Sequence, residues 1–216
     1  MSEYYPESRV ELGGFMAKHY DLVMNVISFG MYSSFIREAI QLMGIKPADK
    51  ILDLGAGTGR NACLMMEYLT AEGEVVGLDI TEKMIAQFKK NCADFPNAKI
   101  VNKRIDLELD YEGHFDKVFI SFVLHGFPQT ARTQIIKNAF QALQKGGEFF
   151  ILDYNEFSLK EMSFFSRTFF KWIECPYAFD FIEKDWKGIL SQQGFGDFRE
   201  HLFFGNFIRL LEGVKV

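Results

Sequence analysis

Three glycines at alternate positions constrain this chain more than any other feature. Gly55, Gly57 and Gly59 directly follow the short apolar run Lys50–Leu54, so a buried strand leads into a tight turn. Residues without a Cβ let a backbone turn sharply and pass close to a ligand. Position 60 is Arg60, whereas the dinucleotide fingerprint GxGxxG requires glycine there. The loop therefore predicts a strand–loop–helix unit for another ligand and disfavours a nicotinamide dehydrogenase.

Strand-like and helix-like segments alternate on either side of this loop. Four further apolar runs predict strands at Glu74–Asp79, Ala98–Val101, Lys117–Val123 and Glu148–Asp153. Helical periodicity predicts helices over Phe35–Met43 with Gly44 as the stop, after the glycine loop through Leu69, from Thr81 as N-cap, and from Ile135 to Lys145-Gly146-Gly147. Alternation of this kind is typical of a parallel sheet covered by helices on both faces.

The alternation loosens beyond Asp153. We expect an aromatic helix at Leu159–Ile173 and another at Lys184–Gln193, which Gly194 ends. The last two apolar runs flank Gly205-Asn206, a dipeptide typical of a two-residue hairpin turn. The pattern predicts an α/β fold: a doubly wound mixed sheet of about seven strands, a C-terminal antiparallel hairpin and a helical, aromatic-rich cap.

Acidic residues follow three of the predicted strands at the edge where open sheets bind ligands. Asp53 would repel a phosphate and suits a ligand with a positive amino or sulfonium group. Asp79 can accept hydrogen bonds from both hydroxyls of a ribose, and Asp106 can accept from an adenine amino group while Ile105 packs on the ring. A lone Asp79 or Asp106 would fit a solvated loop or helix cap equally well, but all three in register with the loop indicate one ligand site.

Composition excludes several other classes. The formal net charge of −5 argues against a general nucleic-acid binder. Cys63, Cys92 and Cys175 are widely spaced without a CxxC pair, so we expect neither a disulfide framework nor a Cys-rich zinc site. The first ten residues lack the pattern of a signal peptide, and no apolar run is long enough to span a membrane. These features predict a cytoplasmic protein in a reducing compartment.

From Lys50 to Leu152 the chain resembles class I S-adenosylmethionine-dependent methyltransferases, which have a Rossmann-like fold. The resemblance is specific at Asp53-x-Gly55-x-Gly57-x-Gly59 and at Val76–Asp79. It implies S-adenosyl-L-methionine as cofactor and S-adenosyl-L-homocysteine as product. Asp53 and the loop would hold the methionine end, Asp79 the ribose, and Asp106 with Ile105 the adenine. The remaining predicted cofactor residues are Ala56, Thr58, Ile80, Met84 and Ser121.

A narrower resemblance lies upstream. Ala17–Gly30 is similar to the A-x-x-Y-D…N…S-x-G segment of the ubiquinone/menaquinone-biosynthesis C-methyltransferases, and Gly205–Leu210 looks like their last strand. In that family the upstream segment closes over the cofactor, which implies that Tyr20 lines the site. The resemblance divides one domain, 1–216, into lid helices (1–45), a cofactor-binding core (46–156), a cap (157–196) and the terminal hairpin (197–216).

Two histidines are candidates for acid–base chemistry. Methylation of an aromatic ring carbon needs the ring's hydroxyl deprotonated, and this calls for a general base. His125 lies just past the fourth predicted strand, and His19 lies beside Tyr20. Either could instead be an ordinary packing histidine. No histidines or carboxylates stand at metal-ligand spacing, so we expect no metal site.

The C-terminal part of the chain is unusually aromatic: 14 of the 24 phenylalanines lie between Phe149 and Phe207. The large apolar residues of the cap are Met162, Phe164, Phe165, Phe169, Phe170, Trp172, Tyr177, Phe179, Phe181 and Trp186. They form either a second small core or a pocket for a flat, lipophilic acceptor. A third interpretation is that they dock the protein peripherally to a membrane. The predicted acceptor pocket comprises Phe122, His125, Phe165 and Tyr177.

The leading prediction is a methyltransferase of a lipophilic or aromatic small molecule, with a quinol ring carbon as one candidate acceptor. A phospholipid amine and a natural-product hydroxyl are alternative acceptors. A non-catalytic protein that binds S-adenosylmethionine would share the glycine loop and Asp79. The sequence leaves the acceptor atom and the oligomeric state open.

Overall fold

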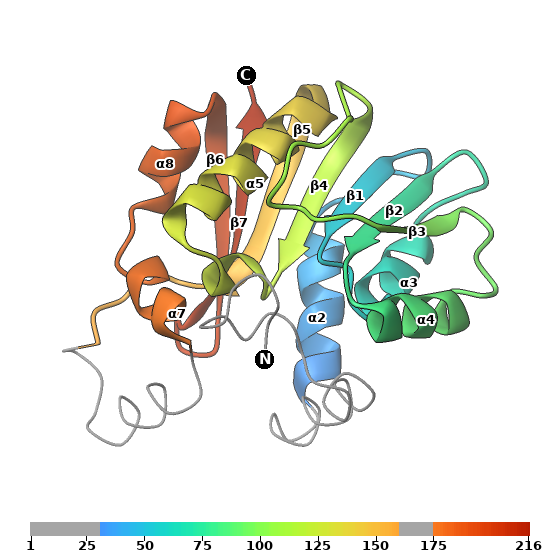
Figure 1. Cartoon of the computed structure of the whole chain (residues 1–216), viewed down its shortest axis with the longest axis horizontal. Helices are drawn as coiled ribbons and strands as arrows, with labels where there is room; N and C mark the ends of the chain where they lie inside the picture. The colour runs from blue at the N-terminus through green and yellow to red at the C-terminus, as the bar shows by residue number, and fades with distance from the viewer. Residues whose placement is uncertain (1–30, 160–174) are drawn as a thin grey trace.

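The computed structural model describes residues 31–159 and 175–216. Its centre is one mixed seven-stranded sheet in the order β3-β2-β1-β4-β5-β7-β6 (Figure 1). The strands are β1 (Lys50–Leu54), β2 (Glu74–Asp79), β3 (Ala98–Asn102), β4 (Phe115–Ser121), β5 (Leu143–Tyr154), β6 (Phe195–Phe203) and β7 (Ile208–Lys215). The predicted α/β class and C-terminal hairpin are confirmed. The expected helix Leu159–Ile173 falls almost wholly outside the described residues.

The strand order reverses direction at β1. β1 pairs in parallel with both β2 and β4, and β7 pairs antiparallel with β5 and β6. The chain runs outward from β1 to β3 and then returns to β4 on the other side of β1. Open sheets of this kind bind ligands at that reversal, beyond the carboxyl ends of the strands. The loops after β1 and β4 therefore flank the expected site.

Helices cover both faces of the sheet. They are α2 (Met31–Leu42), α3 (Arg60–Met66), α4 (Glu82–Asn91), the 3-10 turn η1 (Leu124–Gly126), α5 (Gln129–Ala142), α7 (Pro176–Phe181) and α8 (Trp186–Gln192). One buried cluster joins the sheet to α5, α7 and α8, and a second joins it to α2, α3 and α4. Alternate residues of β1 divide between them: Leu52 packs in the first cluster and Ile51 in the second. No helix of the described segments is long and apolar enough to cross a membrane.

The turn residues act where the sequence predicts. Gly44 has φ of 58° directly beyond α2, which is the left-handed stop that favours glycine. Gly205 and Asn206 have φ of 64° and 72°, and the Phe207 N–H donates to the Phe204 carbonyl at 3.4 Å. Positive φ at both central residues is what a type I′ hairpin turn requires. The predicted hairpin is confirmed, but its connection is longer than predicted: β6 ends at Phe203, β7 begins at Ile208, and Phe204 also leaves the extended conformation with φ of 51°.

Several predicted boundaries are wrong. α5 ends at Ala142 rather than at Lys145-Gly146-Gly147, because Leu143 already pairs with Phe115 of β4 and begins β5. The α3 helix ends at Met66, short of Leu69. β4 ends at Ser121 because the next residue, Phe122, takes a φ of 52°, which breaks the extended backbone.

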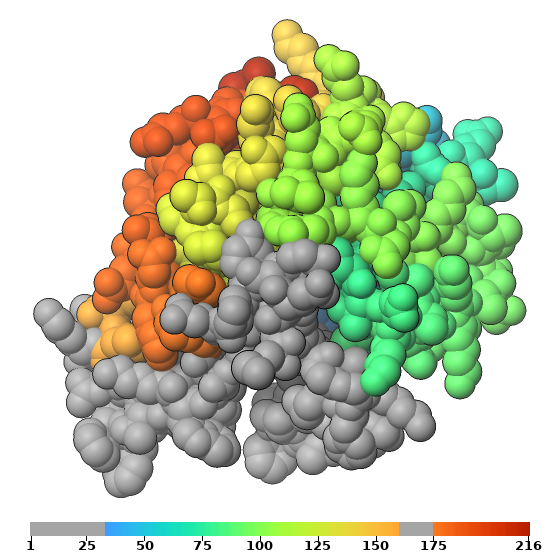
Figure 2. All heavy atoms as spheres, in the orientation of Figure 1, coloured from blue at the N-terminus to red at the C-terminus, as the bar shows by residue number. Residues whose placement is uncertain are grey.

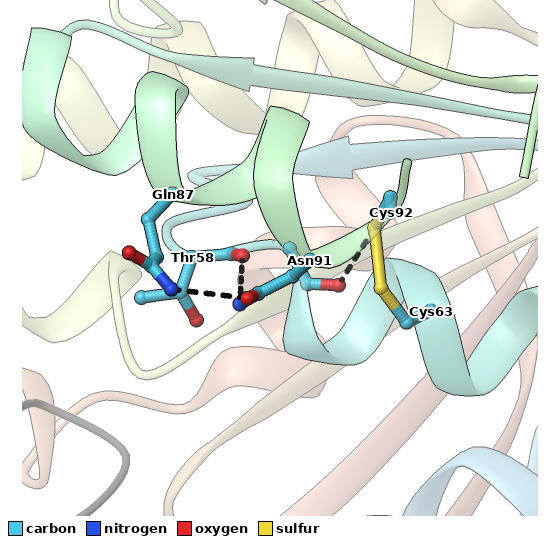
Figure 3. Close-up of a disulfide and its surroundings, with 6 residues drawn as sticks. Thr58, Cys63, Gln87, Asn91 and Cys92 are labelled. Atoms are coloured by element: carbon cyan, nitrogen blue, oxygen red, sulfur yellow. Dashed lines mark hydrogen bonds between the residues drawn. A yellow bond between two sulfur atoms is a disulfide. The ribbon is translucent and has the colours of Figure 1, made fainter. Parts of the chain in front are cut away.

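The cysteine spacing predicted no disulfide framework, and this expectation is wrong for one pair of cysteines. Cys63 of α3 and Cys92, directly after α4, form a disulfide across 29 residues of sequence (Figure 3). The fold places α3 and α4 side by side, and this proximity leaves no mark in the cysteine spacing. Cys175 is a buried free thiol.

Candidate functional site

The glycine loop between β1 and α3 is tied to the end of β2. The N–H groups of Gly55 and Ala56 both donate to the Leu78 carbonyl, at 2.9 and 3.0 Å. Gly55, Gly57 and Gly59 all have positive φ, at 80°, 54° and 80°. Glycine adopts this conformation without strain, so all three positions specify the shape of the loop.

The three glycines differ in what their missing side chains would meet. A Cβ at Gly55 would lie 2.8 Å from Val123, and one at Gly59 would lie 2.7 Å from the Phe88 ring. Those two glycines allow close packing inside the protein. The nearest atom to a Cβ at Gly57 would be the Gly55 carbonyl oxygen, 4.0 Å away. Gly57 is therefore the glycine that leaves room for a ligand.

Asp53 at the carboxyl end of β1 is buried with an unsatisfied oxygen. Within the described residues its Oδ2 has no hydrogen-bond partner. Burial, and secondly the nearby Asp79, raises the pKa of Asp53 to about 7. A buried acceptor without a partner is rare because it loses its hydration without compensation. The site thus fits a ligand that brings a positive group or a donor to Asp53, as the amino group of S-adenosylmethionine would.

Asp79 links the glycine loop to α4. Its Oδ2 accepts from the Gly57 N–H at 2.9 Å, and its Oδ1 accepts from the Thr81 N–H at 2.8 Å. Burial raises the pKa of Asp79, and these backbone hydrogen bonds oppose the rise. The Thr81 hydroxyl and the Ile80 N–H also donate to this carboxylate, so ribose hydroxyls would compete with these donors for its oxygens.

The turn after β3 is held by α5. Asn138 Nδ2 donates to the carbonyls of Ile105 and Leu107 at 2.8 and 2.6 Å. Ile105 is buried, and Arg104 grips both oxygens of Asp106 at 3.1 and 2.5 Å. An adenine amino group at Asp106 would have to share an oxygen with Arg104. Sequence reasoning missed this local ion pair.

His125 lies in η1, beside the end of β5. Its Nδ1 is 2.7 Å from Asp153 Oδ1, and its backbone N–H donates to Asp153 Oδ2 at 3.2 Å. The imidazole also packs edge-on to the rings of Tyr154 and Phe181, with centroids 5.2 and 6.3 Å away. A carboxylate at Asp153 fixes the ring orientation and favours a proton on Nδ1, so proton exchange with an acceptor falls to Nε2.

Arg132 of α5 is fully buried and was absent from the predicted site. Its guanidinium donates to the carbonyls of Leu124, His125 and Tyr177 at 3.2, 3.1 and 2.6 Å. It also pairs with the half-exposed Asp180 of α7 at 2.8 Å. One side chain therefore joins η1, α5 and α7. Its position four residues before Ile136, on the apolar face of the helix, is the signal that could have found it.

The described part of the cap is continuous with the main core. Phe181 and Trp186 are buried with ring centroids 4.4 Å apart, in the same cluster as Ile135 and Phe149. Figure 2 shows α5, α7 and α8 forming one unbroken surface. These two aromatic residues therefore pack in the main core of the domain. Tyr177 is half-buried.

The remaining predicted residues lie around the same edge of the sheet. Ser121 ends β4, and the Phe122 N–H donates to the Leu152 carbonyl at 2.8 Å. Met84 is buried on α4, while Ile80 is half-buried. Thr58, Gly59 and Ala56 belong to the loop itself. His19, Tyr20 and Phe165 lie outside the described residues. Across the two described ranges no group of three or more His, Cys, Asp or Glu residues could hold a metal ion.

Comparison with known proteins agrees with this geometry. The sequence profile of the ubiE/COQ5 methyltransferase family matches residues 9–189. A demethylmenaquinone methyltransferase of Listeria welshimeri is 27% identical over 171 residues, 78% of this chain and 71% of that protein. The ubiquinone/menaquinone biosynthesis C-methyltransferase UbiE of Stenotrophomonas maltophilia is 29% identical over 152 residues, 65% of this chain and 56% of that protein.

A solved structure shows the same fold. The SAM-dependent methyltransferase from Aquifex aeolicus superposes with a TM-score of 0.64 at 16% identity, covering 84% of this chain and 89% of that one. Because the family profile spans most of the sequence, the chain belongs to the ubiE/COQ5 methyltransferase family and is a methyltransferase that uses S-adenosylmethionine as methyl donor.

Proposed function

We propose that this enzyme methylates a ring carbon of a lipophilic hydroquinone, and that His125 accepts the proton of the acceptor's hydroxyl group. The observation that carries this proposal is the His125–Asp153 pair at the carboxyl edge of the sheet. Val123, two residues before His125, packs against Gly55 of the glycine loop, so the histidine turn adjoins the cofactor loop. The names of the curated relatives, which refer to menaquinone and ubiquinone biosynthesis, support a quinol acceptor.

The proposed cofactor residues are those of the loop and the three strand ends. Asp53 would take the positive amino group, Asp79 the ribose hydroxyls, and Ile105 with Asp106 the adenine. Around them would lie Tyr20, Gly55, Ala56, Gly57, Thr58, Gly59, Ile80, Met84 and Ser121. The cofactor supplies an electrophilic methyl group and leaves as a neutral thioether, so catalysis rests on holding the acceptor at the correct distance and angle.

The acceptor's chemistry explains the need for His125. A phenol is a weak carbon nucleophile until its hydroxyl loses a proton, after which the ring carbon bears negative charge. Nε2 of His125 would take that proton, and the Asp153 carboxylate would stabilise the resulting imidazolium. The electron pair of the ring carbon then forms the new C–C bond while the C–S bond breaks toward sulfur. Loss of the proton from the methylated carbon restores the aromatic ring.

The acceptor would lie between the histidine turn and the cap. Phe122, Phe165 and Tyr177 would line its pocket together with His125, and His19 is the alternative proton acceptor. In this proposal residues 46–156 bind the cofactor, and the cap at residues 157–196 selects the acceptor. We place the reaction in the cytoplasm, with peripheral membrane contact as the route to a lipophilic acceptor.

Transfer of a labelled methyl group tests the acceptor class. The purified enzyme is incubated with labelled S-adenosylmethionine and three acceptors: a demethylated naphthoquinol with a short prenyl chain, an aminophospholipid in mixed micelles, and a simple catechol. We expect label on a ring carbon of the naphthoquinol, identified by mass spectrometry and NMR. Label on nitrogen or oxygen instead would refute carbon methylation, and no transfer to any acceptor would favour a non-catalytic cofactor-binding protein.

Variants test the proton acceptor separately. His125→Gln should lower kcat for the naphthoquinol by about 10²–10⁴-fold and leave the affinity for S-adenosylhomocysteine unchanged. His114→Gln is the matched control, because His114 precedes β4 at the opposite edge of the sheet and pairs with Glu74. Equal kcat values for His125→Gln and wild type would remove His125 from the mechanism while leaving the acceptor assignment intact.

A further inference from the structure

We propose that Cys63 and Cys92 are a redox-responsive pair whose disulfide holds the cofactor loop in its binding shape. The pair joins the two helices that flank the glycine loop: Cys63 lies in α3, directly after the loop, and Cys92 follows the last turn of α4 (Figure 3). Both cysteines also contact the loop itself. The Cys63 N–H donates to the Gly59 carbonyl at 2.8 Å, and Cys92 Sγ lies 3.4 Å from the same oxygen.

The end of α4 carries a second attachment to the same loop. Asn91 Nδ2 donates to the Thr58 carbonyl at 2.9 Å, and Gln87 steadies Asn91 through its Oδ1 at 3.0 Å (Figure 3). Phe88, one turn earlier, packs so closely that a Cβ at Gly59 would lie 2.7 Å from its ring. The C-terminal end of α4 thus holds the Thr58 carbonyl through a hydrogen bond and packs against Gly59.

The opposite side of the loop is held by the beginning of the same helix. Asp79 accepts from the Gly57 N–H in the loop and from the Thr81 N–H at the N-terminus of α4. The loop's shape therefore depends on where α4 lies relative to α3. The disulfide is the covalent bond that fixes this relation.

Opening the bond changes this relation without removing a cofactor contact. Reduction by a thiol such as glutathione consumes two thiols, breaks the S–S bond, and leaves two protein thiols and one glutathione disulfide. α3 and α4 then keep their packing and the hydrogen bonds to the loop but lose their covalent link, so more of the loop's ordering is left to cofactor binding. Cys63 is half-buried and can be attacked by an external thiol, whereas the third cysteine, Cys175, is buried. We expect the oxidised enzyme to bind S-adenosylhomocysteine more tightly, by about 5-fold or more.

Ligand binding and disulfide reduction are thermodynamically linked, and this linkage allows a quantitative test. The oxidised and reduced enzymes are titrated with S-adenosylhomocysteine by calorimetry, and the state of each cysteine is determined by alkylation and mass spectrometry. The disulfide is then equilibrated with glutathione buffers with and without saturating S-adenosylhomocysteine. The ratio [GSH]²/[GSSG] at half-reduction should rise in the presence of ligand by the same factor as the two affinities differ.

Matched variants separate this effect from general damage. Cys63→Ser/Cys92→Ser should bind like the reduced wild type in every buffer, whereas Cys175→Ser should keep the full redox response. Circular dichroism checks that each form is folded. Equal affinities for the oxidised enzyme, the reduced enzyme and the double variant would overturn the proposal, as would failure of the pair to form a disulfide in an oxidising buffer. Neither result would touch the assignment of the acceptor or of His125, because only the cofactor is titrated.

Discussion

Asp53 shows how a single residue can be adapted to a ligand at the expense of the empty protein. Burial raises the pKa of its carboxyl group from 3.8 to about 7, with Asp79 adding to the rise. A buried carboxyl group with a raised pKa is destabilised when it is ionised in the empty site. A bound cation stabilises the ionised form, because it replaces the solvation that the carboxylate lost on burial. Asp53 is therefore the residue at which pH should report on both folding and binding.

Unfolding measured against pH tests this. The unfolded chain ionises Asp53 near pH 4 but the folded chain only near pH 7, so this group's contribution to stability falls as pH rises through that window. A shift of about three pKa units corresponds to roughly 4 kcal/mol. Asp53→Asn should match wild type in urea unfolding at pH 4 and exceed it by up to that amount at pH 8. A constant difference between the two proteins across this range would contradict the buried ionisation.

Gly57 gives a second residue-scale prediction. Its φ of 54° and the open space beside it mean that Gly57→Val introduces backbone strain and fills the ligand's position. Binding of S-adenosylhomocysteine should be lost, while the circular dichroism spectrum stays that of a folded protein. Gly113→Val is the control, since Gly113 also has positive φ with open space around it, in a turn outside the proposed site. Equal loss of binding in both variants would attribute the effect to strain alone.

At the scale of elements, the position of the His125 turn depends on the contacts that join η1, α5 and α7. Arg132 supplies three of its hydrogen bonds to backbone carbonyls on η1 and α7, and its guanidinium also lies 5.2 Å from the Phe181 ring centroid. A buried cation with this many partners is expensive to replace, because each carbonyl left behind loses its donor. The histidine turn and the described cap should therefore behave as one unit.

Removing the Arg132 side chain tests whether it holds η1 and α7 together. Arg132→Leu should lower the free energy of unfolding by about 3 kcal/mol, since three buried or partly buried carbonyls each lose a donor at about 1–3 kcal/mol. Asp180→Asn should cost less than about 1 kcal/mol, because Asp180 is half-exposed and its ion pair is screened. Denaturant unfolding of both variants measures the difference. Similar costs would show that the ion pair, rather than the backbone hydrogen bonds, holds the elements together.

At the scale of the whole molecule, the sequence predicts those strands, turns and strand-end residues that a local residue pattern determines. The strands β1, β2, β4 and the second half of β5 are largely apolar runs because both of their faces are buried, whereas β3 lies at the sheet edge and is mostly exposed. The hairpin was marked by Gly205-Asn206, both of which have positive φ. The carboxylates Asp53 and Asp79 followed from their places at strand ends. Two of the missed features arise only when distant segments meet: the Cys63–Cys92 bond and the contacts of Arg132 with η1 and α7. The third, the ion pair of Arg104 with Asp106, is local, but it depends on how the turn after β3 orients the two side chains.

The glycine loop and the two strand-end carboxylates, Asp53 and Asp79, are proposed to hold S-adenosylmethionine. The most direct test of this proposal is calorimetric titration of the wild type and of Asp79→Asn, which keeps the side chain's size but loses one acceptor and the charge. The wild type should bind S-adenosylmethionine and not NAD, and the variant should bind about 10–100-fold more weakly, since hydrogen bonds to a charged group contribute about 1.5–3 kcal/mol each. Unchanged affinity in Asp79→Asn, or preferential binding of NAD by the wild type, would contradict the account.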